Sequence, residues 1–255
     1  MAISFAFILA YMIFCYLVCI WQKNNGLVDV FWGLGFVGIA WLNYSLQKDK
    51  HAIQLAFNCL ITIWGLRLSL FLAMRNIGKE EDFRYAKWRK EWSKNFYLRT
   101  FLQVHLLQGF IMLLVALPII VINQAPFFDH RLLFVIYMGM LFTLTGIVVE
   151  AIADQQKRDF RKKELNPNTF IESGLWKFSR HPNYFGEVLV WIGVFFVAIP
   201  FGKWFITIVS PIVITFLILK VSGIPMLEKK YDENEKYQAY KKRTSAFVPK
   251  PQKKN

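Results

Sequence analysis

The chain has 255 residues, of which 55% are apolar and 25 are Phe, and it carries a formal net charge of +14. This apolar fraction and a mean hydropathy of +0.34 exclude an ordinary soluble domain and predict a protein embedded in a lipid bilayer. The basic balance does not indicate nucleic-acid binding, because the basic stretches lack the soluble fold that a groove-reading module needs.

Apolar segments long enough to cross a bilayer, or nearly so, occur about seven times along the chain. They predict an all-α, polytopic membrane protein, and we expect residues 1–255 to form a single transmembrane domain. The expected spans cover roughly 2–22, 28–46, 52–74, 101–122, 131–153, 183–200 and 202–222.

Basic residues are distributed unevenly between the two sides of the predicted spans. Alternate connections and the C-terminal tail hold about 26 of the 31 Lys and Arg residues. The opposite connections hold only Lys48, Lys50, Arg131 and Lys203. This pattern predicts a cytoplasmic C-terminus and an N-terminus on the outside, in a bacterial inner membrane or the endoplasmic reticulum.

The first polar segment follows the third span and reads RNIGKEEDFRYAKWRKEW over residues 75–92. Arg75 and Arg84 offer planar forks for phosphate, and Tyr85 offers a stacking surface, so the segment suits a nucleotide. The alternative is an interfacial helix whose Trp and Lys side chains anchor it among lipid headgroups.

The second polar segment closes the fifth span, where Glu150, Asp154, Arg158 and Arg161 lie near one helical face. Acidic groups are costly against lipid, so they are expected to face a partner or an aqueous cavity. Asp154 could bind a ribose hydroxyl or an amide, while Arg158 and Arg161 bind phosphates. The alternative is a structural ion pair between Asp154 and Arg158.

The third polar segment lies at the entry to the sixth span, where Pro182 suits the first turn of a helix. Free N–H groups there favour an anion. A simple helix cap is the alternative, but three polar clusters on one membrane face favour a shared anionic ligand. The candidate ligand-binding side chains of this segment are Arg180, His181, Asn183, Tyr184 and Glu187.

No metal site is predicted from the histidines. His51, His105, His130 and His181 are scattered along the chain and show no metal-ligand spacing. We therefore expect any ligand to be an organic anion rather than a metal ion.

Several of these runs together resemble a known family. Residues 174–176, 179–184, 186–187 and 237–249 are similar to the C-terminal domain of the steroid 5-alpha-reductase superfamily, over about residues 140–250. Residues 28–33, 75–85 and 243–247 resemble more narrowly its DUF1295 branch. The resemblance implies a seven-helix membrane reductase whose NADPH lies in a cavity open to the cytoplasm.

The resemblance also implies roles for individual residues. Asp154, Arg158 and Arg161 match the nucleotide-binding positions after the fifth span, and Asn183 and Glu187 match those of the sixth. Arg75, Arg84 and Tyr85 match a basic loop after the third span. The implied reaction transfers hydride to a conjugated carbon–carbon double bond of an apolar enone, such as a steroid-like or other lipid.

A hydrogen-bond donor is needed at the carbonyl oxygen of such an enone, because negative charge develops there. The steroid enzymes assign this duty to a Glu and a Tyr on the early helices, which the chain does not match. Asp29, at the start of the second span, is the candidate catalytic residue. A buried carboxyl can stay protonated and donate, although Asp29 could equally cap its helix.

Two other functions stay open. Isoprenylcysteine and phospholipid methyltransferases also carry an Arg-His-Pro-x-Tyr run, and they bind S-adenosylmethionine. They usually have two adjacent Glu residues ahead of a Tyr-x-x-Tyr, whereas Glu228 is followed by Lys229 here. The arginines also favour NADPH, because S-adenosylmethionine has no phosphate. The second alternative is a non-enzymatic lipid or sterol binder.

Overall fold

The computed structural model describes residues 1–76, 78, 81, 83–164, 166 and 168–252, with the side chains of residues 83 and 84 outside that description. The regular secondary structure of the described residues is all helical, with no β-strand. Within these residues, seven helical segments are long and apolar enough to cross a membrane. The predicted all-α, polytopic architecture is therefore confirmed.

The candidate spans agree with the predicted ones in number and differ at their ends. The fifth span continues past residue 153 to Lys163, because the polar residues that follow the apolar run still favour a helix. The spans cover Ala2–Trp21, Asn25–Leu46, Ala52–Asn76, Tyr85–Gln124, His130–Lys163, Pro182–Phe201 and Trp204–Lys229.

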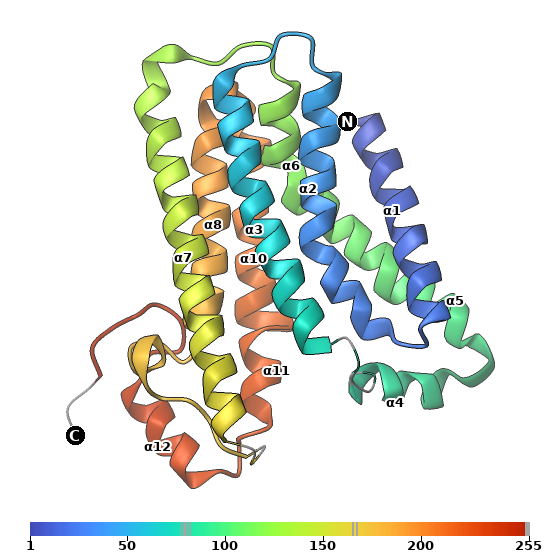
Figure 1. Cartoon of the computed structure of the whole chain (residues 1–255), viewed down its shortest axis with the longest axis vertical. Helices are drawn as coiled ribbons and strands as arrows, with labels where there is room; N and C mark the ends of the chain where they lie inside the picture. Colours follow the sequence, from blue (N-terminus) through green and yellow to red (C-terminus); the bar gives the residue numbers. More distant parts are fainter. Residues whose placement is uncertain (77, 79–80, 82, 165, 167, 253–255) are drawn as a thin grey trace. The chain divides into compact units, whose positions relative to one another are not determined.

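Figure 1 draws the helices, coloured along the sequence. They belong to two compact units. Unit 1 comprises Met1–Leu132 and Ala198–Ser210, and unit 2 comprises Leu133–Val197 and Pro211–Asn255. That residues 1–255 form a single domain, and that the C-terminus is cytoplasmic, stay predictions.

In unit 1, helix α2 (Val28–Leu46) packs against α3 (Ala52–Asn76) and α6 (Leu107–Gln124), and α1 (Ala2–Trp21) packs against α2 and α6. Glycines allow the closest approach. A Cβ atom on Gly33 of α2 would lie 2.3 Å from the carbonyl oxygen of Gly65 on α3. Small residues at such contacts let two helix backbones meet without a hydrophobic driving force from water.

A buried amide pair joins α3 to α6 in unit 1. Asn58 Nδ2 donates to Asn123 Oδ1 at 2.8 Å, and Asn123 Nδ2 donates back to Asn58 Oδ1 at 2.9 Å. Both side chains are fully buried, and Gln54 adds a 2.7 Å hydrogen bond to the Ile122 carbonyl. These polar groups therefore satisfy one another inside the helix bundle.

The fourth span of unit 1 is assembled from several short pieces. It begins with α4 (Phe83–Trp92) and α5 (Phe96–Thr100), and a π-helical turn at Phe101–Leu106 leads into α6. The rings of Trp88 and Trp92 stack at 5.0 Å, and the Arg89 guanidinium lies 4.3 Å from the Phe96 ring centre. A short helix, α9 (Trp204–Thr207), also belongs to unit 1.

Unit 2 is built on α7 (Leu133–Lys163) and α8 (Pro182–Ala198), which approach closely at two glycine pairs. A Cβ atom on Gly146 would lie 2.6 Å from the Gly186 carbonyl oxygen, and Gly139 faces Gly193 in the same way. Because Gly186 has no side chain, the polar end of α7 can pack directly against the first turns of α8.

The remaining elements of unit 2 follow the glycine-paired helices in the chain. Most of α10 (Val209–Phe216) belongs to unit 2. A π-helical turn at Leu217–Val221 connects it to α11 (Ile224–Lys229), and α12 (Glu235–Arg243) follows. Figure 1 shows α12 beside the connection between α7 and α8. The hydroxyl of Tyr240 on α12 donates a hydrogen bond to the Trp176 carbonyl in that connection.

Candidate functional site

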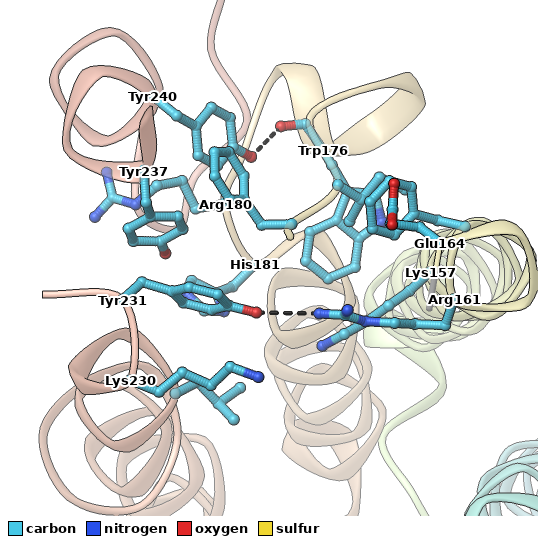
Figure 2. Close-up of a pocket in the computed structure, with 14 residues that line it drawn as sticks. Lys157, Arg161, Glu164, Trp176, Arg180, His181, Lys230, Tyr231, Tyr237 and Tyr240 are labelled. Carbon is cyan, nitrogen blue, oxygen red and sulfur yellow. Dashed lines mark hydrogen bonds between the residues drawn. The ribbon is translucent and has the colours of Figure 1, made fainter. Parts of the chain in front are cut away.

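A cavity of about 460 Å³ lies within unit 2, between the end of α7, the connection before α8, the end of α11 and α12 (Figure 2). Its lining combines the cationic side chains of Lys157, Arg161 and Lys230 with aromatic rings. Among the described residues, no three His, Cys, Asp or Glu side chains gather as metal ligands would. Because of its cations and aromatic rings, the cavity is the candidate ligand site.

Arg161, on the last turns of α7, is held across the cavity by three hydrogen bonds. Its Nη1 donates to the Asn166 carbonyl at 3.1 Å, and its Nη2 donates to the Thr169 carbonyl at 2.7 Å and the Tyr231 hydroxyl at 3.1 Å. Figure 2 shows the guanidinium pointing from α7 toward Tyr231. These three partners are neutral oxygens, so they orient the guanidinium without neutralising its charge.

The two lysines of the cavity lie against aromatic rings on opposite walls. Lys157 Nζ is 5.1 Å from the ring centre of Trp176, and Lys230 Nζ is 4.9 Å from that of Tyr231. The Trp176 indole is fixed by a 3.1 Å hydrogen bond from its Nε1 to the Ala153 carbonyl. Each lysine ammonium therefore lies over an aromatic face of the cavity wall.

Tyrosines of α12 complete the aromatic lining. Tyr237 stacks on Tyr231 at 4.7 Å, and Tyr240 stacks on Phe170 at 5.4 Å. Burial raises the pKa of both Tyr237 and Tyr240. Their hydroxyls therefore stay protonated near neutral pH and act as hydrogen-bond donors.

Arg180 and His181 line the cavity and also bind Glu228 at the end of α11. Arg180 donates to the two Glu228 oxygens at 2.8 and 3.2 Å, and His181 Nε2 lies 3.1 Å from Glu228 Oε1. Burial lowers the pKa of His181, although the Glu228 carboxylate opposes that change. His181 is therefore a neutral imidazole near neutral pH, and its ring stacks on Tyr184 at 5.6 Å.

The predicted polar clusters of α7 and α8 meet within unit 2. Asn183 Nδ2 donates to Asp154 Oδ1 at 3.2 Å, and only 3% of Asp154 is exposed. Glu187 is half-buried one turn further along α8. Arg158, in contrast, donates to Gln155 on its own helix, and it is not part of the cavity lining that the structure describes. Of the predicted residues, Arg161, Arg180 and His181 line the cavity.

The other predicted site residues belong to unit 1. Asp29 lies in the first turn of α2, and the exposed Arg75 lies in the last turn of α3 and donates to Asn76 at 3.2 Å. Tyr85 is buried against Cys19 and meets Trp88 edge to face at 5.5 Å. The side chain of Arg84 lies outside the described residues. That these four residues share a ligand with the residues of unit 2 stays a prediction.

Most of the cavity residues, among them Lys157, Lys230 and Tyr231, and the partner residue Glu228 were not identified as site residues from the sequence. Lys157 follows Asp154 by three residues and precedes Arg161 by four, so the helical face that indicated those two residues also contained Lys157. Glu228 is an acidic residue at the end of a spanning helix, which is a general sign of function. Lys230 and Tyr231 carry no local signal, since only the tertiary fold brings them to α7.

The chain is similar to one protein family and to a protein of a yeast. An uncharacterized protein of Schizosaccharomyces pombe is 24% identical over 207 residues, which cover 70% of this chain and 58% of that protein. No solved structure matches the chain. The family model described as "Protein of unknown function (DUF1295)" matches residues 15–244. Because this match covers most of its length, the chain belongs to the DUF1295 family.

Proposed function

We propose that the protein is a membrane-embedded, NADPH-dependent reductase that acts on a conjugated carbon–carbon double bond of an apolar enone. The observation that carries the proposal is the cavity of unit 2, whose lining combines Lys157, Arg161 and Lys230 with aromatic rings. The resemblance of the DUF1295 family to steroid 5-alpha-reductases supports the same assignment.

The residues of the cavity fit a dinucleotide phosphate. Arg161 is oriented by neutral partners, so its charge remains available to phosphate oxygens, for which a guanidinium is well suited. The rings of Trp176 and Tyr231 offer flat surfaces to a base. A volume of about 460 Å³ lies within the range of roughly 300–1,000 Å³ that is common for ligand sites.

The polar contact between α7 and α8 supplies a second set of groups. Asp154 accepts a hydrogen bond from Asn183, and the Asn183 Oδ1 atom is buried without a hydrogen-bond partner among the described residues. The Asp154 carboxylate and the Asn183 Oδ1 atom could each accept a hydrogen bond from a ribose hydroxyl or a carboxamide of the ligand. NADPH, when bound, would supply the hydride, while these residues bind and orient it. Asp29 remains the proposed donor to the substrate carbonyl oxygen.

S-adenosylmethionine fits the cavity less well than NADPH does. It carries a positive sulfonium and no phosphate, so the two lysines and two arginines of the lining, which outnumber its one carboxylate, Glu164, would repel it. Glu228, which lies where the methyltransferases have paired acidic residues, is bound by Arg180 and His181. A non-enzymatic lipid binder would not need a cavity that combines several cations with stacking rings.

Calorimetric titration of the detergent-purified protein with NADPH, NADH and S-adenosylmethionine tests the proposal. We expect NADPH to bind the unaltered protein, and Asp154→Ala and Arg161→Ala to weaken that binding. Lys162→Ala is the matched control, because Lys162 is the exposed neighbour of Arg161 and pairs with Asp159 at 3.9 Å. NADPH binding would justify screening enones for NADPH oxidation.

The titration also has outcomes that reject the proposal. Binding of S-adenosylmethionine alone would assign methyl transfer to the protein. Binding of none of the three compounds would favour a lipid or sterol binder. NADPH affinity that is equal in Arg161→Ala and Lys162→Ala would show that the cavity is not the nucleotide site.

A further inference from the structure

The Glu228 carboxylate is the centre of a buried ionic cluster in unit 2. Only 6% of Glu228 and 8% of Arg180 are exposed, and Arg180 binds both carboxylate oxygens. His181 Nε2 lies 3.1 Å from Oε1, and Lys241 Nζ lies 3.2 Å from Oε2. One carboxylate therefore contacts three cationic or imidazole side chains, which come from two other segments of the chain.

Each of the joined segments forms a wall of the cavity. The connection before α8 contributes Arg180 and His181 to the lining, and α12, which carries Lys241, contributes Tyr237 and Tyr240. Leu227, near the end of α11, and Lys230, the residue after the helix, also line the cavity, and they flank Glu228 and Lys229 in the sequence. Glu228 itself is outside the lining, so it contacts the walls and not the space between them.

The same connection also binds the C-terminal segment, which we define as residues 235–250. The Arg180 amide donates to the Ser245 carbonyl at 2.8 Å, and the Ser179 hydroxyl donates to the Phe247 carbonyl at 2.7 Å. The Lys250 amide donates to the Phe178 carbonyl at 2.9 Å. These bonds run side by side, so the C-terminal segment is attached along its length to the residues that precede α8.

The Arg180 guanidinium connects the ionic cluster to the C-terminal segment. Its Nη1 donates to the carbonyls of Lys241 at 3.1 Å and Thr244 at 2.7 Å, while Nε and Nη2 bind Glu228. The carboxylate therefore fixes the orientation of the guanidinium, and the guanidinium in turn binds the two carbonyls of the C-terminal segment. Without Glu228, the buried charge of Arg180 would lack its counter-ion and favour exposure to water.

We propose that Glu228 is a positioning residue that holds the cavity walls and the C-terminal segment together, so that its loss releases α12 and opens the ligand site. The identity of the ligand rests on the proposed reductase function, whereas the effect on the C-terminal segment does not. Glu228 acts through Arg180, His181 and Lys241 and makes no contact with the ligand.

Limited chymotrypsin cleavage of the detergent-purified chain tests release of the C-terminal segment. Tyr237 and Tyr240 are 4% and 1% exposed, so cleavage after them requires α12 to leave its place. We expect Glu228→Gln to accelerate this cleavage on the order of tenfold, measured by mass spectrometry of the released fragments. In the same variant, we expect NADPH affinity to fall on the order of tenfold.

Glu172→Gln is the matched control. Glu172 is also a carboxylate that binds the C-terminal segment, through Arg243, but its side chain is 46% exposed. Exposed ion pairs contribute little, so we expect wild-type cleavage and wild-type NADPH affinity. Equal cleavage rates in Glu228→Gln and in the unaltered protein would overturn the proposal.

The double variant Arg180→Met/Glu228→Met separates positioning from stability. Removing both charges avoids a lone buried ion, so the melting temperature should recover toward the wild-type value. Cleavage should stay fast and NADPH affinity low, because the bonds from Arg180 to the Lys241 and Thr244 carbonyls are lost. If both readouts return to wild type with the melting temperature, Glu228 contributes only stability, and the proposal fails.

The two proposals fail in distinguishable ways. If the unaltered protein does not bind NADPH, the reductase function is rejected, while the cleavage rates still decide the role of Glu228. If NADPH binds equally well to the unaltered protein and to Glu228→Gln, the reductase function stands, and positioning of the ligand site by Glu228 is rejected.

Discussion

Arg161 and Tyr231, which are 70 positions apart in the sequence, bind each other and share one acceptor. Arg161 Nη2 donates to the Tyr231 hydroxyl at 3.1 Å, and both donate to the Thr169 carbonyl, at 2.7 and 3.3 Å. The triangle connects the end of α7 to the segment after α11. It therefore fixes the direction in which the guanidinium faces the cavity.

We predict that Tyr231→Phe weakens NADPH binding about two- to tenfold, because the net contribution of one hydrogen bond is about 0.5–1.5 kcal/mol. The phenyl ring would keep its stacking on Tyr237 and lose the hydroxyl, which accepts the bond from Arg161 and donates the longer bond to the Thr169 carbonyl. Calorimetric titration measures the effect. Tyr137→Phe is the control, because Tyr137 is an exposed residue of α7. Equal affinities in the two variants would contradict the role of the triangle.

The glycine contact between α7 and α8 gives a prediction about folding. Gly146→Ala would place a Cβ atom 2.6 Å from the Gly186 carbonyl oxygen and 2.7 Å from the Val190 amide nitrogen. Both are backbone atoms, so the helices must separate, at a cost of about 1–3 kcal/mol. We expect a lower melting temperature in detergent, whereas Thr145→Ala, at the exposed neighbouring position, should melt like the wild type. A Gly146→Ala protein of unchanged stability would argue against this contact.

The sequence predicted the spans well, because apolar runs of membrane length have few alternative structures. It also placed Asp154 and Asn183 on the helical faces that the structure brings into contact at 3.2 Å. The predicted fifth span ended at residue 153, and the helical face assigned to Arg158 and Arg161 is part of the same helix, which continues to Lys163, because hydropathy ends with the membrane and helix propensity does not.

The rest of the candidate site could not be predicted from local patterns. Tyr231 and Glu228 reach Arg161 and Arg180 only through the fold, across sequence separations of 70 and 48 residues. Helical periodicity relates residues one or two turns apart and is silent about such pairs. The sequence therefore indicated Arg180 and His181 of the buried ionic cluster, whereas Glu228 and Lys241 became evident in the structure.

The buried amide pair of unit 1 gives a prediction about stability that is independent of the ligand. Asn58→Ala removes the partner of a fully buried Asn123, and an unsatisfied buried amide costs about 1–3 kcal/mol. Thermal unfolding in detergent should show this loss. The double variant Asn58→Leu/Asn123→Leu should recover much of it, since no amide is then left unpaired. Equal melting of Asn58→Ala and the wild type would contradict this assignment.

The buried imidazole of His181 makes unit 2 sensitive to acid. Burial lowers its pKa in the folded protein, with Lys157 and Arg180 adding repulsion and Glu228 opposing both. An unfolded chain takes up a proton near the ordinary His pKa of about 6.5, while the folded chain takes it up only at lower pH. The unfolded state then binds more protons, so the free energy of unfolding falls as pH decreases below about 6.5.

We therefore expect the melting temperature of the wild type to drop between about pH 7.5 and about pH 5.5 by more than that of His181→Gln, which cannot take up this proton. The comparison removes contributions that the two proteins share, including those of the other three histidines. A wild-type protein that gains stability relative to His181→Gln over this range would mean that the Glu228 carboxylate outweighs burial. His181 would then be a charged member of the ionic cluster rather than a neutral one.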